Sequence, residues 1–234
     1  MPQNGVSPNV NTYTSLINGF CKSEKMDRAL KIWHEMKDLG LILDTTAYCA
    51  LIDGFCRKHD MGRASELFSE LLQAGLSPNT IVYNCMITGY RNLKNTEAAL
   101  GFYEKMKEGG VHRDLSTYTT LIDVLLKDGK LLKASELYGG VLAKGLVPDI
   151  VLYSVLITGL CNKGQIENAH RILKEMDKKG VTPSALLYNT LIAGHFKEGN
   201  LAEAFRIHDD MLEKGLKPDK TTYDILISGK FAGG

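Results

Sequence analysis

The chain has 234 residues, of which 44% are hydrophobic and 24% charged, a composition typical of a folded globular protein and not of a disordered one. Its 28 Lys and Arg residues nearly balance 27 Asp and Glu residues, which excludes a strongly basic surface over the whole molecule. The longest nearly apolar segment, residues 150–161, falls short of the ~20 residues that span a membrane, so no membrane partner is expected.

A tyrosine recurs every 35 residues along the chain, without an insertion or deletion between any two of them. A glycine recurs with the same period from Gly5 to Gly215, and an alanine does so from Ala29 to Ala204. Such a fixed period predicts stacked supersecondary units that bury their apolar faces against one another. The tyrosines are Tyr13, Tyr48, Tyr83, Tyr118, Tyr153, Tyr188 and Tyr223.

Each unit is predicted to contain two helices, as residues 10–44 illustrate. Apolar residues in the segment 13–20 follow the i, i+3, i+4, i+7 spacing of a helix with one buried face. After the polar break KSEK, a second helix is predicted over 26–36, and Gly40 is expected to cap it in a left-handed conformation. The predicted core residues are Tyr13, Leu16, Ile17, Phe20, Met26, Ala29, Leu30, Trp33 and Met36, with Phe68, Tyr103 and Tyr138 at the Trp33 position of later units.

The period divides the chain into complete and partial units. Residues 1–9 are interpreted as the tail of a preceding unit. Residues 220–234 are interpreted as a partial seventh unit, whose single helix is expected to give way at Lys230 to KFAGG. The chain is therefore expected to be a segment of a longer protein. Six complete units are predicted at 10–44, 45–79, 80–114, 115–149, 150–184 and 185–219.

One column of short side chains directly follows the recurring tyrosine. These residues form helices poorly and are unusual at either a solvent-facing or a core position of a helix. A hydrogen bond to the preceding turn would explain Thr and Ser in this column, but it explains Asn less well. The column consists of Thr14, Cys49, Asn84, Thr119, Ser154, Asn189 and Asp224.

A second column of Asn, Asp and Ser directly precedes the first helix of each unit, usually after a proline, as in GLSPN and GLVPD. Residues of these types cap helix N-termini, so capping alone can explain the column. Stacking of the units would nevertheless align both columns along one face, as a line of donors and acceptors suited to an extended ligand. The column consists of Asn9, Asp44, Asn79, Asp114, Asp149, Ser184 and Asp219.

The segments TYTSLINGFCK, AYCALIDGFCR, VYNCMITGY and LYSVLITGLC resemble the pentatricopeptide repeat family, and the resemblance covers essentially the whole chain. The resemblance implies an all-α fold, a right-handed superhelical α-solenoid of helix-turn-helix repeats. It also implies binding of single-stranded RNA at one base per repeat, with the two columns specifying each base.

Position by position, the resemblance pairs each first-column residue with the second-column residue 30 positions later. Thr with Asp resembles a guanine reader and Asn with Asp a uracil reader, which implies the target 5′-G-N-U-G-(A)-U-3′, parallel to the protein. The serine pair only loosely resembles an adenine reader, and the Cys pair matches no common combination. The pairs are Thr14 with Asp44, Cys49 with Asn79, Asn84 with Asp114, Thr119 with Asp149, Ser154 with Ser184, and Asn189 with Asp219.

Two further columns acquire roles from the resemblance. Side chains two positions before the tyrosine would sandwich each base, and they are Thr46, Ile81, Ser116, Val151, Leu186 and Thr221. Cations nine positions after the tyrosine would contact phosphates, and they are Lys22, Arg57, Lys127 and Lys197. The helix dipole equally favours a cation near a helix C-terminus, so this last assignment stays open.

No enzymatic activity, cofactor or metal site is predicted. The histidines form no HExxH or triad pattern, and His170, His195 and His208 occupy positions that other units fill with apolar residues, which indicates packing. The five cysteines include no CxxC pair, so neither a zinc site nor a disulfide framework is expected.

The alternative is a peptide-binding scaffold of the tetratricopeptide kind, which also pairs helices with a period of about 34 residues. Its signature is missing, and short polar side chains replace the large anchors that a peptide groove favours. Exposed terminal helices could also support weak self-association. By resemblance, the protein is expected in a mitochondrion or chloroplast, in RNA processing, stability or translation.

Overall fold

The computed structural model describes the backbone of residues 9–232 and the side chains of residues 9–228. Within this range the chain forms thirteen α-helices and no strand, so the predicted all-α fold is confirmed. The predicted tail at 1–9 lies outside the described residues except for Asn9. The helices are α1 (Val10–Lys22), α2 (Met26–Asp38), α3 (Thr45–Arg57), α4 (Met61–Gln73), α5 (Thr80–Asn92), α6 (Thr96–Glu108), α7 (Leu115–Lys127), α8 (Leu131–Ala143), α9 (Ile150–Asn162), α10 (Ile166–Lys178), α11 (Ala185–Lys197), α12 (Leu201–Glu213) and α13 (Lys220–Ala232).

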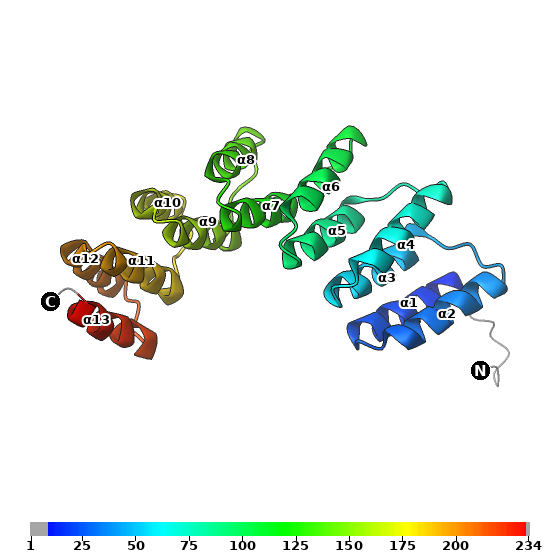
Figure 1. Cartoon of the computed structure of the whole chain (residues 1–234), viewed down its shortest axis with the longest axis horizontal. Helices are drawn as coiled ribbons and strands as arrows, with labels where there is room; N and C mark the ends of the chain where they lie inside the picture. Colours follow the sequence, from blue (N-terminus) through cyan, green and yellow to red (C-terminus); the bar gives the residue numbers. More distant parts are fainter. Residues whose placement is uncertain (1–8, 233–234) are drawn as a thin grey trace. The chain divides into compact units, whose positions relative to one another are not determined.

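The chain divides into two compact units, one ending at Leu121 and the other beginning at Ile122, inside α7. In the first unit α3 packs between α1 and α5, while α2, α4 and α6 each pack on the helix that precedes them (Figure 1). In the second unit α11 packs against α9 and α13, and α10 and α12 pack on α9 and α11. Within each unit the architecture is therefore the predicted series of helix pairs.

The side chains of the second column cap the first helix of each pair. The Asn79 side-chain oxygen accepts a hydrogen bond from the Val82 backbone N–H at 3.1 Å, which satisfies one of the unpaired donors at a helix start. Ser184 precedes α11 without such a bond. The same cap forms at Asn9, Asp44, Asp114, Asp149 and Asp219. The capping interpretation is therefore correct for most of the column, which leaves open whether these residues also serve a ligand.

The recurring glycine ends the second helix of each pair in the left-handed region, as predicted. Gly40 has φ of 64°, and the following Leu41 N–H donates to the Met36 carbonyl at 3.0 Å. This arrangement satisfies a terminal carbonyl of α2 and favours a residue without a Cβ, although Glu24, His59 and Lys94 also adopt a positive φ elsewhere in the chain. The recurring glycine therefore marks the turn between one helix pair and the next.

The recurring tyrosine ties the two helices of one pair together. Tyr13 donates from its hydroxyl to Glu35 at 2.8 Å, and Tyr188 donates to Asp210 at 2.7 Å. The same tie, from the tyrosine to an acid 22 residues later, joins Tyr48 to Glu70 and Tyr153 to Glu175. A hydrogen bond to a charged acceptor typically contributes about 1.5–3 kcal/mol to stability. The alanines from Ala29 to Ala204 are buried alongside, as predicted.

Expectations about core burial and about the last helix need correction. Phe20 and Leu30 are only half-buried. Leu16 is 39% exposed, although Leu51 and Met86 at the same position of later pairs are fully buried, because no described helix precedes α1 to cover it. Tyr103 is only half-buried, unlike Trp33. The last helix does not end at Lys230 but continues to Ala232, since Lys, Phe and Ala are all compatible with a helix.

No described helix has the length and apolarity that crossing a membrane requires.

Candidate functional site

The two polar columns meet at the N-terminal ends of the odd-numbered helices. A first-column residue is the fifth residue of its helix, and a second-column residue is the N-cap of the next odd-numbered helix. In the first unit α3 lies against both α1 and α5, so these helix ends are neighbours. The fold therefore places residues 30 positions apart in the sequence close enough to interact.

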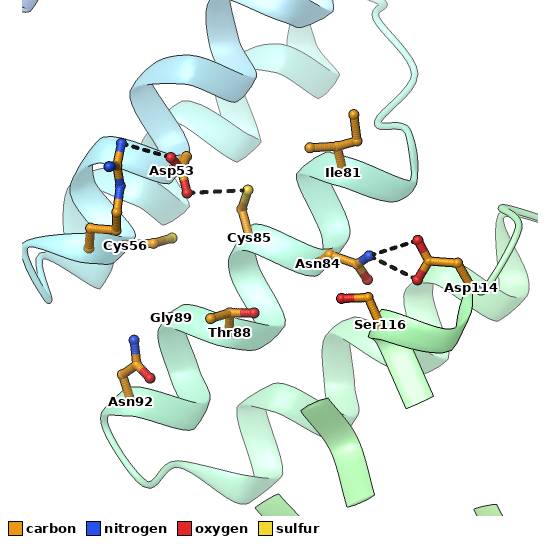
Figure 2. Close-up of a pocket in the computed structure, with 11 residues that line it drawn as sticks. Asp53, Cys56, Ile81, Asn84, Cys85, Thr88, Gly89, Asn92, Asp114 and Ser116 are labelled. Atoms are coloured by element: carbon orange, nitrogen blue, oxygen red, sulfur yellow. Dashed lines mark hydrogen bonds and ion pairs between the residues drawn. The ribbon is translucent and has the colours of Figure 1, made fainter. Parts of the chain in front are cut away.

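Asn84 and Asp114 form the best-defined pair of the first unit. The Asn84 Nδ2 group donates to both carboxylate oxygens of Asp114, at 3.1 and 3.4 Å, and Figure 2 shows the amide facing the carboxylate. Thr117 completes the arrangement, because its hydroxyl donates to Asn84 Oδ1 at 2.7 Å and its N–H donates to Asp114 at 2.8 Å. Burial raises the pKa of Asp114, but the hydrogen bonds from Thr117 and Asn84 outweigh it and hold the pKa below its usual range.

Asn189 and Asp219 repeat this arrangement in the second unit. Asn189 Nδ2 donates to Asp219 at 3.2 Å, and the buried Thr222 hydroxyl donates to Asn189 Oδ1 at 2.8 Å. Both amides keep one N–H and one lone pair beyond these bonds, so each can still donate to and accept from a ligand. The bonds fix the orientation of the amide, which is a requirement for telling one base edge from another.

The threonine of this network was not identified from the sequence, although a signal was present. Among the six predicted pairs, a threonine three positions after the second-column residue accompanies only the two Asn–Asp pairs. The other pairs carry Ala47, Val82, Leu152 and Leu187 at that position. The association between Asn in one unit and Thr in the next could have indicated the contact.

The remaining pairs show no such direct bond within either unit. Thr119 and Ser154 donate to the carbonyls of Leu115 and Ile150 at 2.7 and 2.6 Å, so the local back-bond explains their hydroxyls. The buried Thr14 hydroxyl has no hydrogen-bond partner among the described residues. The Cys85 thiol donates to Asp53 Oδ1 at 3.8 Å (Figure 2), and its proximity to Cys49 is the main reason that the pKa of the Cys49 thiol is lowered.

Two pockets in the first unit collect the predicted residues. One of about 420 Å³ is lined by Thr14, Thr46, Cys49 and Ile81. The other, of about 300 Å³, is lined by Ile81, Asn84, Asp114 and Ser116 (Figure 2). Ile81 borders both pockets, so predicted sandwiching residues alternate with predicted base-specifying residues along the surface. This alternation is the arrangement that successive flat ligand groups would need.

The predicted sandwiching side chains are all exposed. Three of them are large and apolar, and Ile81, Val151 and Leu186 are 60%, 55% and 69% exposed. Apolar side chains that recur at one position of the repeat and remain exposed to water indicate a surface that binds another molecule.

The predicted phosphate-contacting cations fall into two groups. Arg57 pairs with Asp53 and Lys127 with Asp123, both at 2.8 Å and one helical turn apart. Lys22 and Lys197 are exposed and have no ion pair in the described part of the chain. Their helices carry Asn18 and Ala193 where Asp53 and Asp123 stand. Asp53 lines both pockets, so sequence analysis missed an acidic group at the centre of the candidate site.

The histidines also differ from their prediction. His170 and His195 do not lie apart as independent packing residues, because α10 and α11 bring them together beside Glu203 of α12. The spacing of 25 residues between the two histidines links the second helix of one pair to the first helix of the next.

A comparison with known protein families gives matches that repeat with the 35-residue period of the helix pairs. The profile of the PPR repeat family matches residues 8–57, 43–92, 78–127, 113–162, 148–186 and 183–230. The chain belongs to the PPR repeat family. Its successive matches advance by 35 residues, as the tyrosines of this PPR chain do.

Two solved structures share the fold of the PPR chain. The maize pentatricopeptide repeat protein PPR10, in complex with an 18-nt psaJ RNA element, is 23% identical with a TM-score of 0.62 over 96% of this chain and 38% of that one. Nuclear proteinaceous RNase P 2 of A. thaliana is 15% identical with a TM-score of 0.66 over 79% of this chain and 41% of that one. The PPR chain thus spans about two fifths of the length of these structures.

Proposed function

We propose that this PPR chain binds single-stranded RNA along the face that carries the two polar columns, with one base specified by each helix pair. The observation that carries the proposal is the Asn84–Asp114 pair, which is hydrogen-bonded and lines a pocket bordered by the exposed side chains of Ile81 and Ser116. An amide with one donor and one acceptor still available matches the edge of a pyrimidine.

The pocket geometry supports a base as the ligand. Each of the two pockets described above has two sandwiching side chains and at least one base-specifying side chain in its wall. Stacking against such side chains holds a base without regard to its identity, and hydrogen bonds to its edge then discriminate. The proposed target is 5′-G-N-U-G-(A)-U-3′, with Thr14 and Asp44 at the first base and Asn189 and Asp219 at the last. PPR10, which shares the fold, is bound to RNA in its crystal structure.

Family membership extends the proposal to RNA processing, stability or translation in a mitochondrion or chloroplast. Lys22 and Lys197 supply local positive charge that a nearly neutral chain needs to hold phosphates, and Arg57 and Lys127 would add to it on leaving Asp53 and Asp123.

The test is the base preference of Asn84→Thr with Asp114 retained. Fluorescence anisotropy with RNAs that differ only at the third base should show a preference for U in the original chain and for G in the variant. A good base-edge contact discriminates by about 1–3 kcal/mol, so the change should be on the order of 10-fold. Asn189→Thr is the matched control, since it should leave the third base unchanged and alter the sixth.

The possible outcomes distinguish sequence-specific RNA binding itself from the assignment of the base-specifying columns. Equal retention of the target RNA, the same sequence as DNA and a scrambled RNA would reject sequence-specific RNA binding and favour a peptide-binding scaffold. Preference for the target RNA with an unchanged third base in Asn84→Thr would reject only the assignment of the columns.

A further inference from the structure

Three potential metal ligands meet in the second unit, on helices α10, α11 and α12. One ring nitrogen from each of His170 and His195 and one carboxylate oxygen of Glu203 all lie within 4.8 Å of one another. The His170 Nδ1 atom is 3.8 Å from Glu203 Oε1. The two imidazole rings are 6.5 Å apart between centroids and nearly perpendicular, at 79°. None of the three residues belongs to the columns predicted to contact RNA.

His195 is the member of this cluster that packing does not explain. Its side chain is 1% exposed, and neither ring nitrogen has a hydrogen-bond partner among the described residues. Other helix pairs place Phe55 or Leu125 at the same position, where both are buried and bring no polar atom, or Tyr90, whose hydroxyl is hydrogen-bonded to Ser65. Buried polar groups are nearly always satisfied, so a histidine in place of these residues indicates a ligand for its ring.

Charged groups of both signs surround the cluster, because Lys174 and Arg206 as well as Glu203 act on His170. Arg206 donates from Nε to Glu203 Oε2 at 2.8 Å and from its terminal nitrogen to the other carboxylate oxygen. These hydrogen bonds are the main reason that the pKa of Glu203 falls to about 2. Burial is the main reason that the pKa of His170 is lowered. A carboxylate oxygen and the lone pair of an imidazole nitrogen are the groups of these side chains that bind metals.

Arg206 already supplies a positive charge to Glu203, so a bound cation would have to displace it. Its side chain is 57% exposed, and its guanidinium lies 3.5 Å from His170 Nε2. Because the side chain is long and reaches water, it can rotate away while the two histidines, on packed helices, stay. A divalent cation would then replace it as the partner of Glu203.

We propose that His170, His195 and Glu203 bind one zinc-class divalent transition-metal ion, with Arg206 as the competing cation. Two imidazoles and a carboxylate form a zinc ligand set, with the fourth position left to water. Zinc bonds of about 2.0–2.1 Å place tetrahedral ligand atoms about 3.3 Å apart, so the atoms of the observed cluster, which lie within 4.8 Å of one another, would have to approach by about 1.5 Å at most. Nitrogen ligands select against Ca²⁺ and Mg²⁺, which take oxygen ligands.

Such an ion would act as a cross-link between two successive helix pairs. His170 belongs to α10, whereas His195 and Glu203 belong to the following pair, α11 and α12. Metal binding to the folded chain alone stabilises it by mass action, so the unfolding temperature of the second unit should rise with ion concentration.

The test is titration of the full chain with Co²⁺, followed by Zn²⁺ competition and thermal unfolding. The original chain should bind one Co²⁺ with the intense visible bands of tetrahedral nitrogen and oxygen coordination, without the ultraviolet band of thiolate ligation. His195→Leu should remove these bands and the Zn²⁺-dependent rise in unfolding temperature. Leucine occupies this position at Leu125 and Leu160, so the variant is expected to fold, which circular dichroism checks.

Two further variants make the result decisive. Arg206→Gln should tighten Co²⁺ binding by removing the competing charge, and a purely structural role for His195 would not produce this gain. His208→Leu, on α12 but outside the cluster, should leave binding unchanged. Loss of a ligand should weaken binding by at least ~10-fold. The absence of saturable binding to the original chain, or retention of the Co²⁺ spectrum in His195→Leu, would overturn the proposal.

Discussion

The Asn84 and Asn189 sites contain the same three residue types and share the bonds from amide to carboxylate and from threonine to amide, yet they differ in exposure and in surrounding charge. Asn84 is partly exposed and lines a pocket with the Asp53–Arg57 ion pair, whereas Asn189 is 3% exposed. In the helix pair before Asn189, Thr158 and Asn162 occupy the positions of Asp53 and Arg57. Identical base-specifying residues therefore do not imply equal access or equal electrostatics, because residues outside the columns set both.

The largest expected effect concerns the buried hydroxyls of Thr117 and Thr222. Removing the hydroxyl in Thr222→Val leaves the buried Asn189 Oδ1 without its donor, at a cost of about 1–3 kcal/mol. Thr117→Val should cost less, since water can reach the partly exposed Asn84 and replace the lost bond. Amide hydrogen exchange in α13 and α7 measures the two local losses.

Serine variants are the controls for this pair, because Thr→Ser keeps the hydroxyl and should preserve protection at both sites. Equal loss of protection in the two valine variants would show that the difference in exposure has no energetic consequence.

A smaller effect is expected from Asp53→Asn. The substitution keeps the size of the side chain and releases Arg57 from its ion pair, while removing a negative charge from both pockets. RNA binding should tighten, and the slope of log K against log salt should steepen by about 0.7 for one added phosphate contact. Anisotropy titrations across a salt series provide the measurement.

Arg57→Gln combined with Asp53→Asn separates the two contributions of this change. If loss of the Asp53 negative charge is the whole effect, the double variant should bind RNA as tightly as Asp53→Asn does, with no steeper dependence of log K on log salt. A steeper slope that survives the loss of Arg57 would contradict its role as the phosphate contact.

The smallest effect is expected in the pH dependence of stability. Hydrogen bonds lower the pKa values of Asp114 and Asp219 in the folded state, against the opposing effect of burial. A folded-state pKa below the unfolded value of about 3.9 contributes stability that is present above that pH and is lost as the pH falls through the lowered pKa. The unfolding temperature of the original chain should therefore fall as the pH is lowered from about 5 toward the lowered pKa values.

Asp114→Asn should reduce this acid dependence while retaining a capping side chain. An unchanged pH profile in the variant would show that the folded-state pKa of Asp114 does not differ from that of the unfolded chain.

The fold was predictable because each repeated residue has a local physical role. Gly40 ends a helix, Asp44 caps the next one, and the apolar spacing in between gives the buried faces. The tie from Tyr13 to Glu35 also has a fixed spacing, but it depends on the packing of two helices and is not a property of either one.

The candidate site was predictable only as columns of residues. The columns at Asn84 and Asn189 are identical in type, so nothing in them indicates that one amide is more exposed than the other. The contact of His170 with His195 joins different helix pairs, and its spacing is meaningful only when the packing is known. The same spacing joins Ser65 to Tyr90, whose hydroxyls are 2.9 Å apart, which shows that it is a general contact of this fold.

The double role of Asp114, which caps α7 and anchors Asn84, has a consequence for building new specificities by exchanging modules. A module cut between residues 114 and 115 would separate Asp114 from Thr117, although both bind the same amide. A module boundary after residue 117 keeps Asn84, Asp114 and Thr117 together in one transferable module. The natural unit of exchange in this chain is therefore offset from the unit that the helix pairs suggest.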